Sequence, residues 1–128
     1  MPAPKAILVI EDDTDTRVSI CQVLEMNGYE TRSAHNGKDG LEILLACGDD
    51  ICLVITDLMM PTMDGWQMIT EAKKHGNVRD IPIHIITATH IIPFGIDATK
   101  KPFSADELLD AVERRLGGKS EIRTHGAF

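Results

Sequence analysis

Short runs of apolar residues alternate along the chain with stretches in which apolar residues recur every three or four positions. Uninterrupted apolar runs are typical of strands buried on both faces, and the longer spacing is typical of helices with one apolar face. Five strands are predicted, at residues 6–10, 29–33, 51–56, 82–87 and about 96–99. Because strands and helices alternate, we expect an α/β fold in which helices cover both faces of a parallel sheet.

Four helices are predicted, each with a capping residue or a glycine near its ends. In chain order they cover residues 14–27, stopping at Asn27 and Gly28; Asn36 to Gly48; a stretch capped by Asp64; and a stretch that starts at the capping box of Ser104 and Glu107 and ends at Gly117 and Gly118. Their inward faces are expected to hold Ile20, Val23 and Leu24; Leu41, Leu44 and Leu45; Trp66, Ile69 and Ala72; and Ala105, Leu108, Leu109, Val112 and Leu116.

Acidic residues stand directly after two of the buried strands. Glu11, Asp12 and Asp13 follow the first strand, Asp57 follows the third, and Thr87 ends the fourth. In open parallel sheets, ligands collect outside the carboxyl ends of the strands, where these side chains would meet. The pattern therefore predicts a site at that edge, with three carboxylates from Asp12, Asp13 and Asp57 around one small volume.

Three neighbouring carboxylates repel one another unless one is protonated or a cation binds between them. A site made of carboxylate oxygens suits Mg²⁺, which also binds phosphate oxygens, and an aspartate can itself accept a phosphoryl group. Thr87 would donate a hydrogen bond to that group, and Lys101 would supply a positive charge. Taken singly, each residue has a structural explanation: Asp12 or Asp13 as a helix cap, Thr87 as a strand residue, Lys101 as a solvated cation. Their coincidence at one sheet edge favours a site.

Together, the acid pair after the first strand, DLMMPTMDG at 57–65, TA at 87–88 and KPF at 101–103 resemble a response-regulator receiver domain of two-component signalling, of the CheY-like, single-domain type. The resemblance covers residues 5–116. It implies a flavodoxin-like, doubly wound five-stranded parallel sheet in the order 2-1-3-4-5.

The resemblance also implies a mechanism. A histidine kinase or phosphotransfer protein would transfer a phosphoryl group to Asp57. Mg²⁺ would be held by Asp12 or Asp13, by Asp57 and by the backbone carbonyl of Met59. Thr87 and Lys101 would contact the phosphoryl group, and the Lys101–Pro102 peptide bond would be cis.

Two features depart from the receiver pattern. Only residues 88–95, interrupted by Pro93, remain between the fourth and fifth predicted strands, whereas a crossover with its helix needs roughly ten to twelve residues. The helix between these strands is therefore expected to be shortened or absent. Ala98 stands where receivers usually carry the aromatic residue of their switch, so we expect the 88–95 loop to move instead. Its apolar residues Ile91, Ile92 and Phe94 either lie near an uncovered sheet face or fold over it.

Composition narrows the class of protein. At 128 residues we expect one receiver domain over 1–118 and a flexible tail over 119–128. The net charge of −7 argues against a nucleic-acid surface, which needs a basic patch. The three cysteines fit neither a disulfide framework nor a zinc site. No signal peptide or membrane span is expected, which favours a cytoplasmic protein.

These expectations describe a signalling switch that is not an enzyme and acts through a partner protein, because no output domain is expected after Leu116. A homodimer through residues 88–98 and the last helix is a further expectation. One alternative is a pseudo-receiver, a binding module that works without phosphorylation, which Ala98 and the short crossover favour. A second is a Mg²⁺-dependent phosphatase. It is disfavoured because Met59 stands where such an enzyme carries its general acid.

Overall fold

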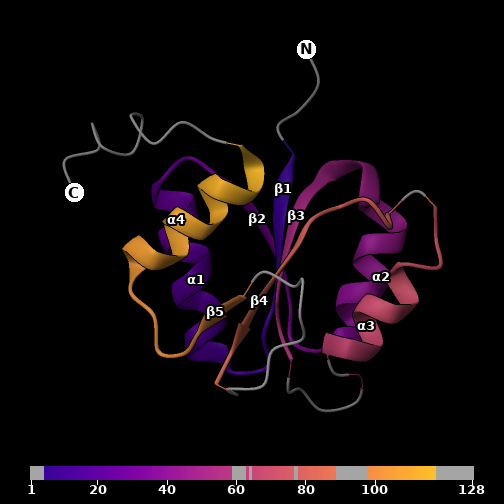
Figure 1. Ribbon diagram of the computed structural model, residues 1–128, viewed down its shortest axis with the longest axis horizontal. Helices are drawn as coiled ribbons and strands as arrows, with labels where there is room; N and C mark the ends of the chain where they lie inside the picture. The colour runs from indigo at the N-terminus through magenta and orange to yellow at the C-terminus, as the bar shows by residue number, and fades with distance from the viewer. Residues whose placement is uncertain (1–4, 59–62, 64, 77, 89–97, 118–128) are drawn as a thin grey trace.

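The structure, a computed structural model, describes residues 5–58, 63, 65–76, 78–88 and 98–117. Within them the chain forms a central parallel sheet with helices packed on both faces (Figure 1). Helices α1 (Thr14–Met26) and α4 (Ala105–Leu116) cover one face, and helices α2 (Gly37–Cys47) and α3 (Gly65–Ala72) cover the other. This is the three-layer arrangement that the alternation of strands and helices predicts.

The sheet has five parallel strands in the order β2-β1-β3-β4-β5, which confirms the predicted flavodoxin-like topology. The strands are β1 (Ala6–Ile10), β2 (Glu30–Ala34), β3 (Ile51–Asp57), β4 (Ile83–Thr87) and β5 (Ala98–Lys100). The first four start and end within one residue of their predicted bounds. β5 extends one residue past its predicted end, and residues 96 and 97, where its start was predicted, lie outside the described part of the chain.

The core has one layer on each face of the sheet, and β1 contributes to both. Ala6, Leu8 and Ile10 pack into the layer under α2 and α3, whereas Ile7 and Val9 pack into the layer under α1 and α4. All five residues are buried. Alternate side chains of a strand point to opposite faces, so a central strand covered on both sides must be apolar throughout. This explains the uninterrupted run at 6–10.

The helix caps follow the sequence closely. The Asn36 side chain accepts a hydrogen bond from the Asp39 N–H at 2.7 Å at the start of α2, which then ends at Cys47 and continues as the 3₁₀ turn η1 (Gly48–Asp50). At α4 both hydrogen bonds of the Ser104–Glu107 capping box are present. The predicted cap of α3, Asp64, lies outside the described residues.

For one residue, the predicted inward face of α4 is wrong. Leu108, Leu109 and Val112 are buried, but Ala105 is exposed, and Ala111 is buried in its place. Side chains tilt toward the N-terminal end of a helix, so the first residue of α4 extends beyond the packed turns. Leu116 packs partly buried against the same layer, as expected.

The connection between β4 and β5 consists of residues 88–97, of which 89–97 are outside the described part. The expectation of a shortened or absent helix there, and the expected positions of Ile91, Ile92 and Phe94, fall on these residues. The described residues hold four α-helices, and α4, which follows β5, is the last helix predicted from the sequence. Residues 119–128, the predicted tail, also lie outside. Among the described helices none is long and apolar enough to cross a membrane.

Candidate functional site

An acidic cluster lies where β1 and β3 end side by side. Ile10 of β1 pairs with Thr56 of β3, so the residues that follow β1 lie beside Asp57. Glu11 is fully buried, Asp57 is 6% exposed, and Asp12 is exposed. A carboxylate oxygen from each of these three acids lies within 4.8 Å of the other two. The structure thus brings acids from both strand ends together, as the sequence predicts.

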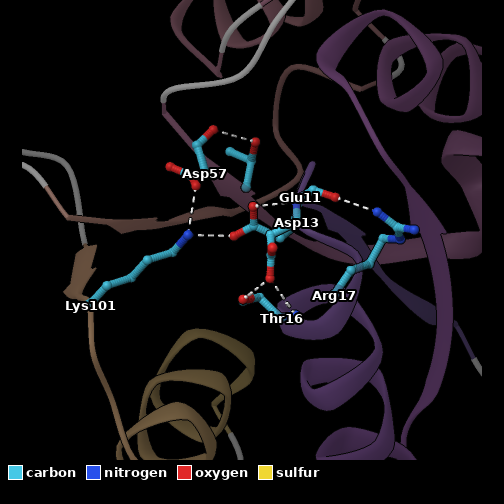
Figure 2. A network of polar contacts seen from close by, with 7 residues as sticks. Glu11, Asp13, Thr16, Arg17, Asp57 and Lys101 are labelled. Carbon is cyan, nitrogen blue, oxygen red and sulfur yellow. Dashed lines mark hydrogen bonds and ion pairs between the residues drawn. The ribbon is translucent and has the colours of Figure 1, made fainter.

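Lys101 reaches this cluster from the segment after β5. Its Nζ donates hydrogen bonds to Asp57 Oδ2 at 2.7 Å and to Glu11 Oε1 at 2.5 Å (Figure 2). Its backbone N–H donates to the carbonyl of Thr87 at 2.7 Å, which fixes the start of the segment on β4. The Lys101–Pro102 peptide bond is cis, as expected. The ammonium group therefore links three segments that are far apart in the sequence.

Burial and charge act in opposite directions on this ion pair. Burial raises the pKa of Glu11 above its ordinary value, despite the hydrogen bond from Lys101 that lowers it. Burial alone would lower the pKa of Lys101, but its hydrogen bonds to Asp57 and Glu11 outweigh this and raise the pKa. Lys101 is therefore an ammonium ion at neutral pH and balances part of the negative charge of the cluster.

Asp13, predicted as a candidate metal ligand, lies outside the cluster. Its Oδ2 accepts hydrogen bonds from the backbone N–H of Thr16 at 2.9 Å and from the Thr16 hydroxyl at 2.6 Å, so it is the N-cap of α1 (Figure 2). The same hydrogen bonds hold the pKa of Asp13 below its ordinary value. Glu11 takes the place in the cluster that the sequence prediction gave to Asp13. The signal for this was the cap position itself, directly before the first helical residue.

Arg17 is a second residue that sequence reasoning missed. Its guanidinium donates a hydrogen bond from Nη1 to the backbone carbonyl of Glu11, six residues earlier in the chain, at 2.8 Å. The backbone N–H of Asp13 also donates to Glu11 Oε2 at 3.1 Å. These contacts stabilise the turn between β1 and α1. No residue spacing in the sequence predicts them, because they depend on how the chain turns after the strand.

Thr87 lies at the predicted edge. It is the last residue of β4 and fully buried, and the residue before it pairs with Asp57. It therefore stands one position beyond Asp57 on the neighbouring strand. On its other side, Thr87 pairs with Lys100 of β5, next to Lys101. The structure thus places Thr87, Asp57 and Lys101 on three adjoining segments.

The chain after β3 returns closely onto the strand end. The Gly65 N–H donates to the carbonyl of Leu58 at 2.9 Å, and a Cβ added at Gly65 would lie only 2.4 Å from the Asp57 carbonyl oxygen. Only glycine permits this approach without displacing backbone. Met59, whose backbone carbonyl was predicted as a metal ligand, lies outside the described residues.

The donor set fits a divalent, oxygen-preferring cation. Carboxylates are the ligands that Mg²⁺ and Ca²⁺ prefer, and the three acids offer oxygens close enough to share one ion. When all groups are ionised, three carboxylates and the Lys101 ammonium leave two negative charges, which one divalent ion neutralises. The residues present thus fit the Mg²⁺ that the sequence analysis expected.

Comparison with known proteins gives a family match over most of the chain. Residues 7–113 match the family described as "Response regulator receiver domain". The chain is 35% identical over 130 residues to the transcriptional regulatory protein HprR of Escherichia coli K12, covering 95% of this chain and 53% of HprR. It thus spans about half the length of the curated relatives that it matches.

Two solved structures show the same fold. A putative response regulator from Chloroflexus aurantiacus is 27% identical, with a TM-score of 0.80 over 90% of this chain and 99% of that one. The receiver domain of the sensor histidine kinase PA1611 from Pseudomonas aeruginosa, solved with a magnesium ion in its active site cleft, is 24% identical. Its TM-score is 0.81 over 91% of this chain and 100% of that one; at this identity the likeness supports the fold alone.

Proposed function

The chain belongs to the response regulator receiver family of two-component signalling, and we propose that it is a phosphorylation-controlled switch with Asp57 as phosphoryl acceptor. The observation that carries the proposal is the position of Asp57. Its carboxylate is almost buried at the end of a central strand, paired with the Lys101 ammonium at 2.7 Å, and close to Glu11 and Asp12. The phosphoryl donor would be a histidine kinase or phosphotransfer protein.

In the proposed reaction, a carboxylate oxygen of Asp57 attacks the phosphorus atom of a phosphohistidine. A P–O bond to Asp57 forms as the P–N bond breaks, and the imidazole nitrogen keeps the electron pair of the broken bond. Lys101 contacts Asp57 Oδ2 and would pair with a phosphoryl oxygen. Thr87, at the end of the next strand, would donate a hydrogen bond from its hydroxyl to another.

Asp12, Asp57 and the backbone carbonyl of Met59 are the proposed Mg²⁺ ligands, with Glu11 beside them in the position first assigned to Asp13. When bound, the ion would neutralise charge on the phosphoryl oxygens. The protein's own contribution is to hold the acids together before the ion arrives. Arg17 fixes the Glu11 carbonyl, and Gly65 brings the chain after β3 back onto Asp57.

A pseudo-receiver that binds a partner without phosphorylation is the second candidate. One observation favours it: Ala98, a half-buried small residue, begins β5 where receivers usually have the aromatic residue of their switch. Phosphoryl acceptance separates the two candidates, because a pseudo-receiver has no need of it.

The test is phosphorylation by a small donor. The protein would be incubated with Mg²⁺ and phosphoramidate, and its intact mass followed by mass spectrometry. We expect the mass of one phosphoryl group on the wild type and none on Asp57→Asn. Asp49→Asn, an exposed carboxylate on η1, is the matched control and should be modified like the wild type. An unmodified wild type, or equal modification of Asp57→Asn, would contradict the proposed acceptor.

A further inference from the structure

Two glycines in the first turn of α2 allow this helix to lie close to Met63, which follows β3, and to Ile10, which ends β1. The Gly37 N–H donates to the backbone carbonyl of Met63 at 3.0 Å, in the segment that leads from β3 to α3. Gly40, three residues later, lies against the side chain of Ile10, the last residue of β1. Residues three apart share one face of a helix. One face of α2 therefore contacts both Met63, which follows β3, and Ile10, which ends β1.

The two glycines meet different kinds of atoms. A Cβ at Gly37 would lie 2.2 Å from the carbonyl oxygen and 3.0 Å from the carbonyl carbon of Met63, both backbone atoms. A Cβ at Gly40 would lie 2.4 Å from Cδ1 of Ile10, the far end of a side chain. A side chain can change rotamer to admit a methyl group, whereas backbone can do so only if a whole segment moves.

Two described residues between β3 and the body of α3 make contacts that bear on the strand end. Gly65 donates to the Leu58 carbonyl at 2.9 Å and lies against the Asp57 carbonyl oxygen, so the start of α3 abuts the end of β3. The carbonyl of Met63, two residues before Gly65, accepts the hydrogen bond from Gly37 of α2. Gly37 therefore fixes the backbone just before the contact between Gly65 and Asp57.

We propose that Gly37 is a positioning residue for the site at Asp57. By admitting the Met63 carbonyl to its own N–H, it holds Met63 and, two residues later, Gly65, which lies against the backbone carbonyl of Asp57. The inference rests on the proposed function, because Asp57 is the proposed phosphoryl acceptor and a proposed ligand of Mg²⁺.

The test compares three Gly→Ala variants of the full chain. Gly37→Ala presses on backbone and Gly40→Ala presses on a side chain, while Gly76→Ala enters open space, with nothing within 4 Å of the added carbon. Mg²⁺ would be titrated into each protein while backbone amide resonances are followed by NMR. Free energies of unfolding would be measured by urea denaturation in parallel.

Gly37→Ala is expected to bind Mg²⁺ about 10–100-fold more weakly, as is usual when a group that orients a metal ligand is lost. Even without metal, its amide resonances at Leu58 and Gly65 should differ from those of the wild type. Gly40→Ala should lose stability while its Mg²⁺ affinity stays unchanged, and Gly76→Ala should change neither. Unchanged Mg²⁺ affinity in Gly37→Ala, or equal weakening in Gly40→Ala, would overturn the positioning role.

The wild-type titration separates this inference from the proposed function. A wild type that does not respond to Mg²⁺ contradicts both, whereas a wild type that responds equally with Gly37→Ala contradicts the inference alone. If Gly37→Ala fails to fold, a measurement on the wild type replaces it. Adding beryllofluoride, an aspartyl-phosphate mimic, to the Mg²⁺ form should shift the Gly37 amide resonance and leave that of Gly76 in place. An unmoved Gly37 resonance would overturn the proposal.

Discussion

The three consecutive acids after β1 have different surroundings although they are chemically alike. Glu11 is buried against Lys101, Asp12 is exposed beside it, and Asp13 turns away to cap α1. The chain changes from strand to helix within these residues, and the first turn of a helix leaves backbone N–H groups that need an acceptor. Asp13 meets that need, so three acids in a row provide two members of the cluster and one helix cap.

Asp13→Asn tests this division, because it keeps an acceptor for the cap but removes the charge. Hydrogen bonds from Thr16 hold the folded-state pKa of Asp13 below its ordinary 3.8. Ionised Asp13 therefore contributes stability that is present above pH 3.8 and lost as the pH falls through the lowered pKa. Urea unfolding should show Asp13→Asn less stable than the wild type at neutral pH, with the difference vanishing in acid.

Mg²⁺ titration of the same variant supplies the control. Asp13→Asn should bind Mg²⁺ like the wild type, whereas Asp12→Asn should bind it much more weakly, because of these two acids it is Asp12 that offers an oxygen to the cluster. Equal loss of binding in both variants would show that Asp13 is a ligand after all.

The sequence predicts well the role of residues whose hydrogen-bond partners lie close to them in the chain. Asn36 and Ser104 act within three residues of themselves, and their caps are where they were expected. Arg17 and Gly37 act through the carbonyls of Glu11 and Met63, which only the folded chain brings to them. Glu11 was seen at the strand end but not as a member of the cluster, because a turn decides which of three adjacent acids faces the sheet edge.

Elements follow the same rule. β1 and β3 were predicted to within one residue, since strands covered on both faces must be apolar throughout. β5 is a three-residue edge strand with two half-buried side chains and an exposed lysine, so its apolar pattern is weak, and its predicted end is wrong by one residue. What fixes β5 is its register on β4, where Ile85 pairs with Ala98. The sequence of one strand alone does not determine its register on its neighbour.

The N-cap of α4 allows the stability of a helix to be tested separately from the acidic cluster. Its capping box begins three residues after Lys101, and both of its hydrogen bonds are formed. Ser104→Ala is expected to lower the free energy of unfolding by about 1 kcal/mol, while Ser104→Thr should lose much less. Urea denaturation measures both.

Mg²⁺ affinity should stay unchanged in both variants, because Lys101 is held independently by its backbone hydrogen bond to Thr87 and by its ion pairs. A large loss of Mg²⁺ affinity in Ser104→Ala would show instead that the start of α4 positions Lys101.

The site joins parts of the chain that are remote in sequence. Lys101 contacts Glu11 across 90 positions and Asp57 across 44. The strand order brings these segments together, since β1 and β3 are neighbours at the centre and β4 links them to β5. A ligand that binds all of these segments is therefore a cross-link of the folded state, absent when the chain unfolds.

Mg²⁺ with beryllofluoride should consequently stabilise the entire fold. A ligand at a hundred times its dissociation constant adds about 2.7 kcal/mol to the free energy of unfolding if it binds only the folded state. Thermal or urea unfolding would measure this for the wild type, with Asp57→Asn, which lacks the acceptor carboxylate, as the control. Because the ligand bridges segments from β1 to Lys101, amide hydrogen exchange should slow in β1 and in α4 alike. Protection confined to the residues around Asp57, or equal stabilisation of Asp57→Asn, would show that the ligand does not link these segments through the acceptor.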